Sequence, residues 1–277
     1  MTGAKALKLP QTIAVGPKRT GTTWLHGNLV GQVGLPYGVK ETQFFDKFYD
    51  RGLEWYGRHF VHCNHELPIM EVAPSYFHSQ EARARIAEHI PECKIICTLR
   101  NPVDRAYSLY RLLKIYAKTK LTFEEAFETI PEFMESNRYV HHITAWQEIF
   151  GKDRVLIMIF DDLKKDPHNY LKKICDFVGI PEFSLNEEAL KAPAKEALAR
   201  NRHLAYWGEQ LGYLLRSFQA YKVLNALKGL GLRKLLFEGG GDLPPMRVET
   251  HEKLKAHFLT EIEGLEKINS CDLSGWK

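Results

Sequence analysis

Residues 12–25 have the sequence TIAVGPKRTGTTWL, and this stretch decides the fold of the chain. The apolar residues 13–15 predict a short buried strand, because a brief apolar run bounded by a turn signal is typical of such strands. Gly16 and Pro17 predict the turn, and apolar spacing that begins at Trp24 predicts a helix. Together these elements predict an anion-binding loop, since the first N–H groups of a helix lack partners and its dipole favours negative charge.

The same turn supplies basic and hydroxyl side chains that suit the oxygens of a phosphate or sulfate group. The residues expected to bind this anion are Lys18, Arg19, Thr20, Gly21, Thr22 and Thr23. Gly16 and Gly21 have the spacing of the Walker A loop, but Thr22 stands where that loop has its lysine. In an ATPase or kinase that lysine reaches the β- and γ-phosphates, so its absence argues against a P-loop kinase. An ordinary strand–turn–helix with solvated charges is the alternative interpretation.

The segment PKRTGTTW, residues 17–24, resembles the 5′-phosphosulfate-binding loop of sulfotransferases, which use 3′-phosphoadenosine 5′-phosphosulfate (PAPS). Family members more often carry lysine at the position of Arg19, and here Lys18 lies one residue earlier. The resemblance implies PAPS as the donor, 3′,5′-diphosphoadenosine (PAP) as the product, and a stabilising role for Arg19 and Lys18 at the leaving oxygen. No residue cluster indicates a metal site, because the Cys and His residues lack ligand spacing apart from the adjacent His141 and His142.

The segment VKETQFF, residues 39–45, is similar to the K-E-x-x-F-F segment of carbohydrate sulfotransferases, including the heparan sulfate group. In those enzymes the glutamate is the general base, which implies this catalytic role for Glu41. We expect Glu41 to lie at a strand end that faces the sulfuryl group. Two alternatives stay open. Glu41 is a surface carboxylate, or His78 is the base, because cytosolic sulfotransferases of small phenols and steroids use a histidine.

Residues 69–77, IMEVAPSYF, predict a short strand and resemble the E-K-x-P-x-Y-F segment of the same enzymes. Val72 stands where those enzymes have a lysine that helps to position the sulfuryl group. The resemblance therefore implies that another cation takes over this task or that the acceptor is bound differently. The candidate cations are Lys18, Lys40 and Arg19.

Residues 94–99, KIICTL, predict a buried strand, and residues 99–110, LRNPVDRAYSLY, resemble the 3′-phosphate-binding motif of the family. The resemblance implies that Arg100 and Ser108 bind the 3′-phosphate. Arg100 follows a parallel strand, where ligands of open α/β sheets bind, whereas Ser108 has the alternative of being an incidental helix serine. The late basic residues that the resemblance adds are Arg200 and Arg202. The alternative interpretation of Arg200 and Arg202 is that they lie on a solvated face of a helix.

Apolar strand signals alternate with helix signals along residues 12–182. This order predicts an α/β protein with a P-loop-like, doubly wound parallel sheet that is flanked by helices and built by right-handed crossovers. Residues 183–277 carry mainly helix signals and predict a helical C-terminal cap with a nucleotide-covering segment. We expect a single sulfotransferase domain over residues 1–277.

The composition narrows the function further. A net charge of +4 over 277 residues suits an anionic nucleotide but is too small to indicate nucleic-acid binding. No apolar run is long enough to cross a membrane, and residues 1–12 lack the apolar core of a signal peptide. The five scattered cysteines predict reduced thiols. These features predict a cytoplasmic protein without a membrane or nucleic-acid partner.

The sequence therefore predicts a PAPS-dependent sulfotransferase that acts on a hydroxyl or nitrogen of a small-molecule acceptor, such as a natural product. A carbohydrate or glycolipid O-sulfotransferase is the first alternative, because the K-E-x-x-F-F segment occurs in glycan-acting enzymes. A P-loop kinase and a non-catalytic nucleotide-binding scaffold are the others. The sequence leaves open the identity of the acceptor, the choice between O- and N-sulfation, and the oligomeric state.

Overall fold

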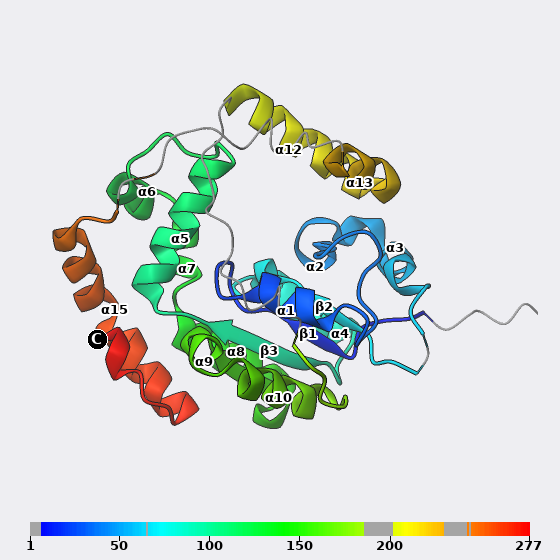
Figure 1. Cartoon of the computed structure of the whole chain (residues 1–277), viewed down its shortest axis with the longest axis horizontal. Coiled ribbons are helices and arrows are strands. Elements are labelled where there is room, and N and C mark those ends of the chain that lie inside the picture. The colour runs from blue at the N-terminus through cyan, green and yellow to red at the C-terminus, as the bar shows by residue number, and fades with distance from the viewer. Residues whose placement is uncertain (1–6, 65, 186–201, 230–242, 244) are drawn as a thin grey trace, which may run out of the picture. The chain divides into compact units, whose positions relative to one another are not determined.

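The computed structural model describes residues 7–64, 66–185, 202–229, 243 and 245–277 (Figure 1). The chain forms two compact units. The first comprises residues 1–100 and 141–191, and the second comprises residues 101–140 and 192–277. The sequence does not indicate that residues 101–140 group with the C-terminal segment. The single domain with a core at residues 12–182 and a cap at residues 183–277 stays a prediction.

The first unit contains a parallel, four-stranded sheet with the strand order β2-β1-β3-β4. Its strands are β1 (Thr12–Ala14), β2 (Met70–Val72), β3 (Lys94–Leu99) and β4 (Val155–Ile159). Each lies within a segment whose apolar residues predict a buried strand. Because β1 pairs with both β2 and β3, the winding of the sheet reverses there. Ligands of open α/β sheets bind beyond the carboxyl ends of the strands at such a point, so the loops after β1 and β3 mark the candidate site.

The helices of the first unit alternate with these strands along the chain (Figure 1). They are α1 (Thr22–Leu29), α2 (Phe44–Lys47), α3 (Leu53–Gly57), α4 (Gln80–His89), α9 (Phe160–Lys165) and α10 (Pro167–Val178), with 3₁₀ turns at Tyr49–Arg51, Arg58–Phe60, Pro74–Tyr76 and Lys152–Arg154. Helix α8 (Tyr139–Phe150) begins in the second unit and continues into the first. Ser79 caps α4 by accepting a hydrogen bond from Ala82 N.

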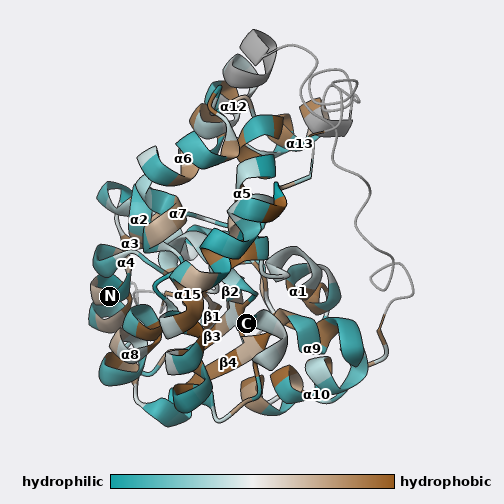
Figure 2. Cartoon of the chain, turned by 90° about the vertical axis from the view of Figure 1, so that its left-hand side faces the viewer, coloured by the Kyte–Doolittle hydropathy of each residue, from teal (hydrophilic) through white to brown (hydrophobic). Residues whose placement is uncertain are grey.

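Helices pack on both faces of the sheet. One face meets α1, α9 and α10 in a hydrophobic cluster. Its fully buried members include Ala14, Leu29, Met70, Val72, Ile96 and Ile174. Figure 2 shows brown at β3 and β4 and alternating teal and brown along α10, as expected for an amphipathic helix. On the other face, Arg83 of α4 lies 5.5 Å from the ring centroid of Trp146 on α8, and its charge acts on the thiol of Cys97 in β3. The predicted α/β fold is therefore confirmed.

The segment around Glu41 differs from its predicted structure. Residues 39–43 form no strand and run as a loop into α2. Thr42 N donates to the side chain of Glu71 at 2.8 Å rather than to the backbone of a neighbouring strand. A side chain, and not a sheet ladder, therefore holds this segment, so the expected strand end at Glu41 is wrong.

The second unit is helical in the part that the structure describes. Its elements are α5 (Pro102–Ile115), α6 (Phe123–Thr129), α7 (Pro131–Glu135), α12 (Arg202–Ser217), α13 (Tyr221–Gly229), α15 (Val248–Asn269) and a 3₁₀ turn at Ser274–Trp276. Asn101 caps α5, and Thr122 with Glu125 forms a capping box at α6. Asn and Thr are among the residues preferred at helix N-caps, and the Thr-x-x-Glu spacing is typical of a capping box. Helix α15 packs against α5.

Two further properties of the described residues bear on the sequence analysis. No helix among them is both long and apolar enough to cross a bilayer. All five cysteines are free, and four of them are buried. The prediction of unpaired thiols is therefore confirmed.

Gly16 approaches β3 so closely that a side chain does not fit. A Cβ atom at this position would overlap the Oγ1, N and O atoms of Thr98, so the loop or the strand must move. We expect Gly16→Ala to lower the free energy of unfolding by about 1–3 kcal/mol, the usual cost of overpacking, in urea denaturation. Gly27→Ala is the matched control, because nothing lies within 4 Å of its added methyl group on α1. There alanine is expected to stabilise by about 0.4–1 kcal/mol, and equal effects at both sites would contradict the tight contact.

Candidate active site

The loop that follows β1 is fixed to β3 by backbone and hydroxyl contacts. Val15 N donates to Ile96 O at 2.9 Å. Thr20 Oγ1 donates to Pro17 O at 2.7 Å and lies 2.8 Å from Thr98 Oγ1. Because the one hydroxyl proton of Thr20 goes to Pro17, the hydroxyl of Thr98 donates to Thr20. The side chain of Thr20 is fully buried, so its hydroxyl holds the loop from inside rather than serving a ligand.

Helix α1 begins at the end of this loop, and its N-terminus suits an anion. The N-cap residue Gly21 has a φ of 90°, in the left-handed region that favours glycine. A Cβ atom there would also lie 2.8 Å from the ring of Phe160. Gly21 has no side chain to cap the helix, and no acidic residue occupies the first turn. The N–H groups of this turn and the positive end of the dipole are therefore left for a ligand.

Lys40 connects this helix start to Glu41. Its Nζ donates to Thr22 Oγ1 at 3.2 Å and to Thr23 Oγ1 at 3.3 Å. The same Nζ lies 3.2 Å from Glu41 Oε1, and the two side chains are 24% and 23% exposed. An isolated ion pair of this kind contributes little to stability. Its importance lies in geometry, because one ammonium group contacts both the anion loop and a carboxylate.

His26 of α1 lies near the same ammonium group. Burial, together with the charge of Lys40, lowers the pKa of His26 to about 4. The imidazole is therefore neutral at pH 7 and adds no positive charge to the site.

Arg100 directly follows β3 and lies over the same aromatic ring, that of Phe160, which the loop approaches. Its guanidinium carbon lies 5.3 Å from the ring centroid of Phe160, and Lys164 Nζ lies 5.0 Å from the same centroid. Gly21 contacts this ring from the loop side, as the position of its absent Cβ shows. Phe160 therefore brings the anion loop and Arg100 together, and both distances are within the range of cation–π attraction.

Three predicted nucleotide-binding residues belong to the second unit. Ser108 is buried on α5. Arg202 is the first residue of α12, and Arg200 lies outside the described residues. The role of these residues at a 3′-phosphate stays a prediction.

The remaining candidates occupy different surroundings. Lys18 and Arg19 are half-buried in the turn of the loop. Arg19 has a φ of 78°, a conformation that is uncommon for residues other than glycine and that concentrates at functional sites. His78 follows the 3₁₀ turn Pro74–Tyr76, and its ring centroid lies 6.4 Å from that of His142 on α8. His78 therefore has a ring neighbour on α8, whereas Glu41 contacts Lys40 at the anion loop.

Sequence reasoning did not identify Thr98, Phe160 and Glu71 as parts of this region. Thr98 and Phe160 have the pattern of core residues, because they lie in the apolar runs KIICTL and RVLIMIF. Glu71 offered one usable signal, a carboxylate within the otherwise apolar run IMEVA. A buried carboxylate needs hydrogen-bond partners. Thr42 and Tyr56 donate hydrogen bonds to that of Glu71.

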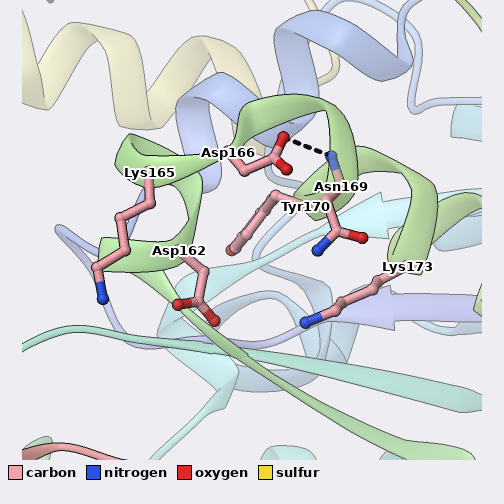
Figure 3. Close-up of a pocket in the computed structure, with 6 residues that line it drawn as sticks. All are labelled: Asp162, Lys165, Asp166, Asn169, Tyr170 and Lys173. Carbon is pink, nitrogen blue, oxygen red and sulfur yellow. Dashed lines mark hydrogen bonds between the residues drawn. The ribbon is translucent and has the colours of Figure 1, made fainter.

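A separate surface pocket lies on α9 and α10 (Figure 3). It is lined by Asp162, Lys165, Asp166, Asn169, Tyr170 and Lys173. Asp166 Oδ1 accepts a hydrogen bond from Asn169 N at 3.0 Å and so caps α10. None of the predicted site residues lines this pocket, and its mixed charges favour no class of ligand.

Comparisons with known proteins agree with this geometry. The chain is 30% identical over 228 residues to the bifunctional heparan sulfate N-deacetylase/N-sulfotransferase 3 of Homo sapiens, which covers 74% of this chain and 25% of that protein. It is 31% identical over 188 residues to the heparan sulfate glucosamine 3-O-sulfotransferase 3B1 of Mus musculus, which covers 65% of this chain and 48% of that protein. The matched region thus spans about a quarter to a half of these relatives.

A solved structure and a family model extend the comparison. The crystal structure of a sulfotransferase from Alicyclobacillus acidocaldarius matches with a TM-score of 0.70 at 20% identity, covering 97% of this chain and 99% of that one. This likeness shows a shared fold. The model of the sulfotransferase domain matches residues 9–202, which include the anion loop, Glu41 and Arg100. The chain therefore belongs to the sulfotransferase domain family.

Proposed function

We propose that this protein transfers the sulfuryl group of PAPS to a nitrogen or oxygen of a carbohydrate acceptor. The observation that carries the proposal is the contact of Lys40 Nζ with the hydroxyls of Thr22 and Thr23 and with Glu41 Oε1, because it joins an anion-binding loop to a carboxylate. PAPS, when bound, supplies the sulfuryl group from its 5′-phosphosulfate. The chain supplies the groups that bind the donor, stabilise charge and accept a proton.

The donor set of the loop fits a phosphosulfate. The start of α1 offers unpaired N–H groups, and its first turn holds no acidic residue that would repel an anion. Thr22 and Thr23 add hydroxyls, and Lys18 and Arg19 add positive charge. These groups stabilise the negative charge that grows on the leaving oxygen. Arg100, beyond β3, is assigned a charge-assisted contact with the 3′-phosphate.

Glu41 is assigned the role of general base. Its carboxylate would accept the proton of the acceptor hydroxyl or amine while that atom forms a bond to sulfur, and the bond from sulfur to the bridging oxygen of PAPS would break so that PAP leaves with the electron pair. The ion pair with Lys40, at 3.2 Å, directs the carboxylate toward the loop where the sulfuryl group is held. Positioning and electrostatics carry most of the rate enhancement in such group transfers.

Lys40 is assigned the task of the lysine that the family has at position 72. Val72 has no exposed surface and packs in the hydrophobic cluster, so it offers no cation. Among the candidates Lys18, Lys40 and Arg19, we assign the task to Lys40 because its ammonium group contacts both Glu41 and the helix start. From this place its ammonium group would bind the sulfuryl oxygens when PAPS is present.

The relatives favour a carbohydrate as the acceptor over the small molecule expected from the sequence. The two relatives compared above are named for the N- and 3-O-sulfation of heparan sulfate. A free amine or hydroxyl of a glucosamine residue is therefore the proposed acceptor group. The cytoplasmic location and the absence of a metal, a membrane partner and a nucleic-acid partner stay predictions. A P-loop kinase is disfavoured by Thr22 at the Walker lysine position.

Substitution of Glu41 and of His78 distinguishes these two candidates for the general base. We expect Glu41→Gln to lower kcat by about 10²–10⁴-fold, the usual loss for a general base, while the Kd for PAP changes within about threefold. Lys40→Met is expected to lower kcat by about tenfold or more, because a charge at the reacting group is lost. His78→Ala is the comparison, with a smaller effect. Near-normal turnover of Glu41→Gln, together with a large loss in His78→Ala, would assign the base to the histidine.

The two loop threonines are expected to have different roles. Thr20→Val leaves Pro17 O and the Thr98 hydroxyl without their partner, so we expect it to destabilise the fold by about 1–3 kcal/mol. Thr23 is exposed, and Thr23→Val is expected to change stability by less than about 0.5 kcal/mol but to raise the Kd for PAP about tenfold. Thermal unfolding and titration calorimetry measure the two effects. The reverse pattern would show that Thr20 is the ligand-binding hydroxyl.

An acceptor comparison tests the substrate class. The pure protein with PAPS is expected to sulfate glucosamine-containing oligosaccharides of the heparan type and to leave small phenols and hydroxylated natural products unmodified. Mass spectrometry of both acceptor sets detects the transfer. Sulfation of the small molecules alone would overturn the carbohydrate proposal, and retention of ATP instead of PAPS would indicate a kinase.

A further inference from the structure

Glu71, the central residue of β2, has a carboxylate without exposed surface. Thr42 N donates to its Oε1 at 2.8 Å, and Thr42 Oγ1 donates to the same atom at 2.6 Å. Tyr56 OH donates to the Oε2 atom at 2.7 Å. Burial of a charge is costly unless hydrogen bonds compensate for the lost water. Here neutral donors from the loop at residues 39–43 and from α3 supply those bonds.

The hydrogen bonds of this network all run toward Glu71. Phe45 N donates to Tyr76 OH at 3.3 Å, and Tyr76 OH lies 3.3 Å from Thr42 Oγ1. Because the single hydroxyl proton of Thr42 is directed to Glu71, the hydroxyl of Tyr76 donates to Thr42. The carboxylate therefore only accepts, and the ionised form of Glu71 is the form that this geometry fits.

The network holds a segment that has no other regular support. Residues 39–43 belong to no strand, so the sheet ladder does not fix them. Thr42 is bound to Glu71 through both its backbone N–H and its hydroxyl, and Lys40 and Glu41 immediately precede it. A small displacement of Thr42 therefore moves both residues relative to the anion loop.

We propose that Glu71 is a positioning residue for sulfuryl transfer, because its carboxylate anchors Thr42 and thereby holds Glu41 and Lys40 against the anion loop. This inference rests on the proposed function, which assigns the proton to Glu41 and the sulfuryl oxygens to Lys40. Glu71 is enclosed and acts through Thr42 without touching the reacting atoms.

The protonation of Glu71 adds a pH dependence to this role. Burial raises the pKa of Glu71 to about 7, against the opposing hydrogen bonds of Thr42 and Tyr56, and the charge of Asp46 on α2 raises it further. As the pH falls through 7 the carboxyl of Glu71 takes up a proton. The oxygen that carries the proton then points an O–H group at the donor group of Thr42 or Tyr56, and that hydrogen bond is lost. We expect Thr42 to lose part of its anchor and kcat to fall.

The phenol and thiol groups near Glu71 do not change charge in this pH range. Besides Asp46, the groups that act on Glu71 or on its partners are Tyr56, Tyr76 and Cys93. Burial raises the pKa of each of these three, so all stay uncharged near pH 7. Burial also raises the pKa of Asp46 above its ordinary value, and Glu71 is the group whose titration near pH 7 is expected.

The contribution of Glu71 to stability changes in the opposite direction. Its pKa is about 7 in the folded protein against an ordinary value of 4.5, so the folded state binds the proton more tightly. Between these pH values the folded state holds more protons than the unfolded state, and stability rises as the pH falls. Loss of activity with a rising unfolding temperature therefore distinguishes loss of position from acid unfolding.

Glu71→Gln tests the inference, because glutamine has the same shape but does not titrate and offers one acceptor oxygen instead of two. We expect kcat at pH 8 to fall by about tenfold or more, the Kd for PAP to stay within about threefold, and the acid limb near pH 7 to disappear from the kcat profile. Amide hydrogen exchange at residues 40–45 is expected to quicken. Glu66→Gln is the matched control, since this carboxylate is exposed in the loop before β2, and it is expected to change none of these quantities.

A second pair of variants keeps the test valid if Glu71→Gln folds poorly. Thr42→Val removes the hydroxyl at nearly constant shape and is expected to lower kcat, whereas Thr42→Ser keeps the hydroxyl and is expected to restore it. If Glu41→Gln loses turnover while Glu71→Gln and Thr42→Val keep the wild-type kcat and pH profile, the positioning role is wrong. If Glu41→Gln keeps turnover, Glu41 is not the general base, and the assignment on which this inference rests fails whatever the result at Glu71.

Discussion

The site depends on the contact between the loop after β1 and the neighbouring strand β3. Gly16 lies so close to Thr98 that no side chain fits between them, and the hydroxyls of Thr20 and Thr98 meet at 2.8 Å within the protein. These contacts fix the direction in which α1 leaves the sheet. The first N–H groups of α1, which we propose to bind the anion, therefore take their direction from the packing beneath the loop.

Burial, more than the number of ionisable residues, determines which groups near the site carry a charge. Burial keeps His26 neutral, leaves Lys40 half-exposed between two hydroxyls and a carboxylate, and encloses Glu71 completely. The balance of charge at the anion loop therefore rests on Lys18, Arg19, Lys40 and Glu41. A reaction that builds negative charge on one oxygen gains from positive groups that are already in place.

Local signals in the sequence predicted much of the fold. The run KIICTL is β3 residue for residue, and the caps at Ser79, Asn101 and Thr122 form as their spacing indicates. These features depend on neighbours within a few positions. The position of residues 39–43 was missed, because Thr42 is held by Glu71, which lies 29 positions away.

The candidate site divides in the same way. The anion loop and the segment that carries Glu41 were evident as motifs, whereas the inward hydroxyl of Thr20 was not. Its direction depends on Thr98, 78 positions later in the chain. The contact of Phe160 with both the loop and Arg100 likewise depends on how β4 is placed in the sheet. The segments that carry the candidate site could thus be predicted from local patterns, whereas the long-range contacts that hold them in place could not.

The enclosed carboxylate of β2 also bears on self-association. In the described sheet β2 is an outermost strand of three residues, and outermost strands are the places where sheets of separate molecules join edge to edge. A short strand with an inward-pointing charge is a poor template for such joining, because any new strand must preserve the hydrogen bonds of that charge. Glu71 therefore gives this edge of the sheet a resistance to aggregation that an apolar residue at the same position would not give.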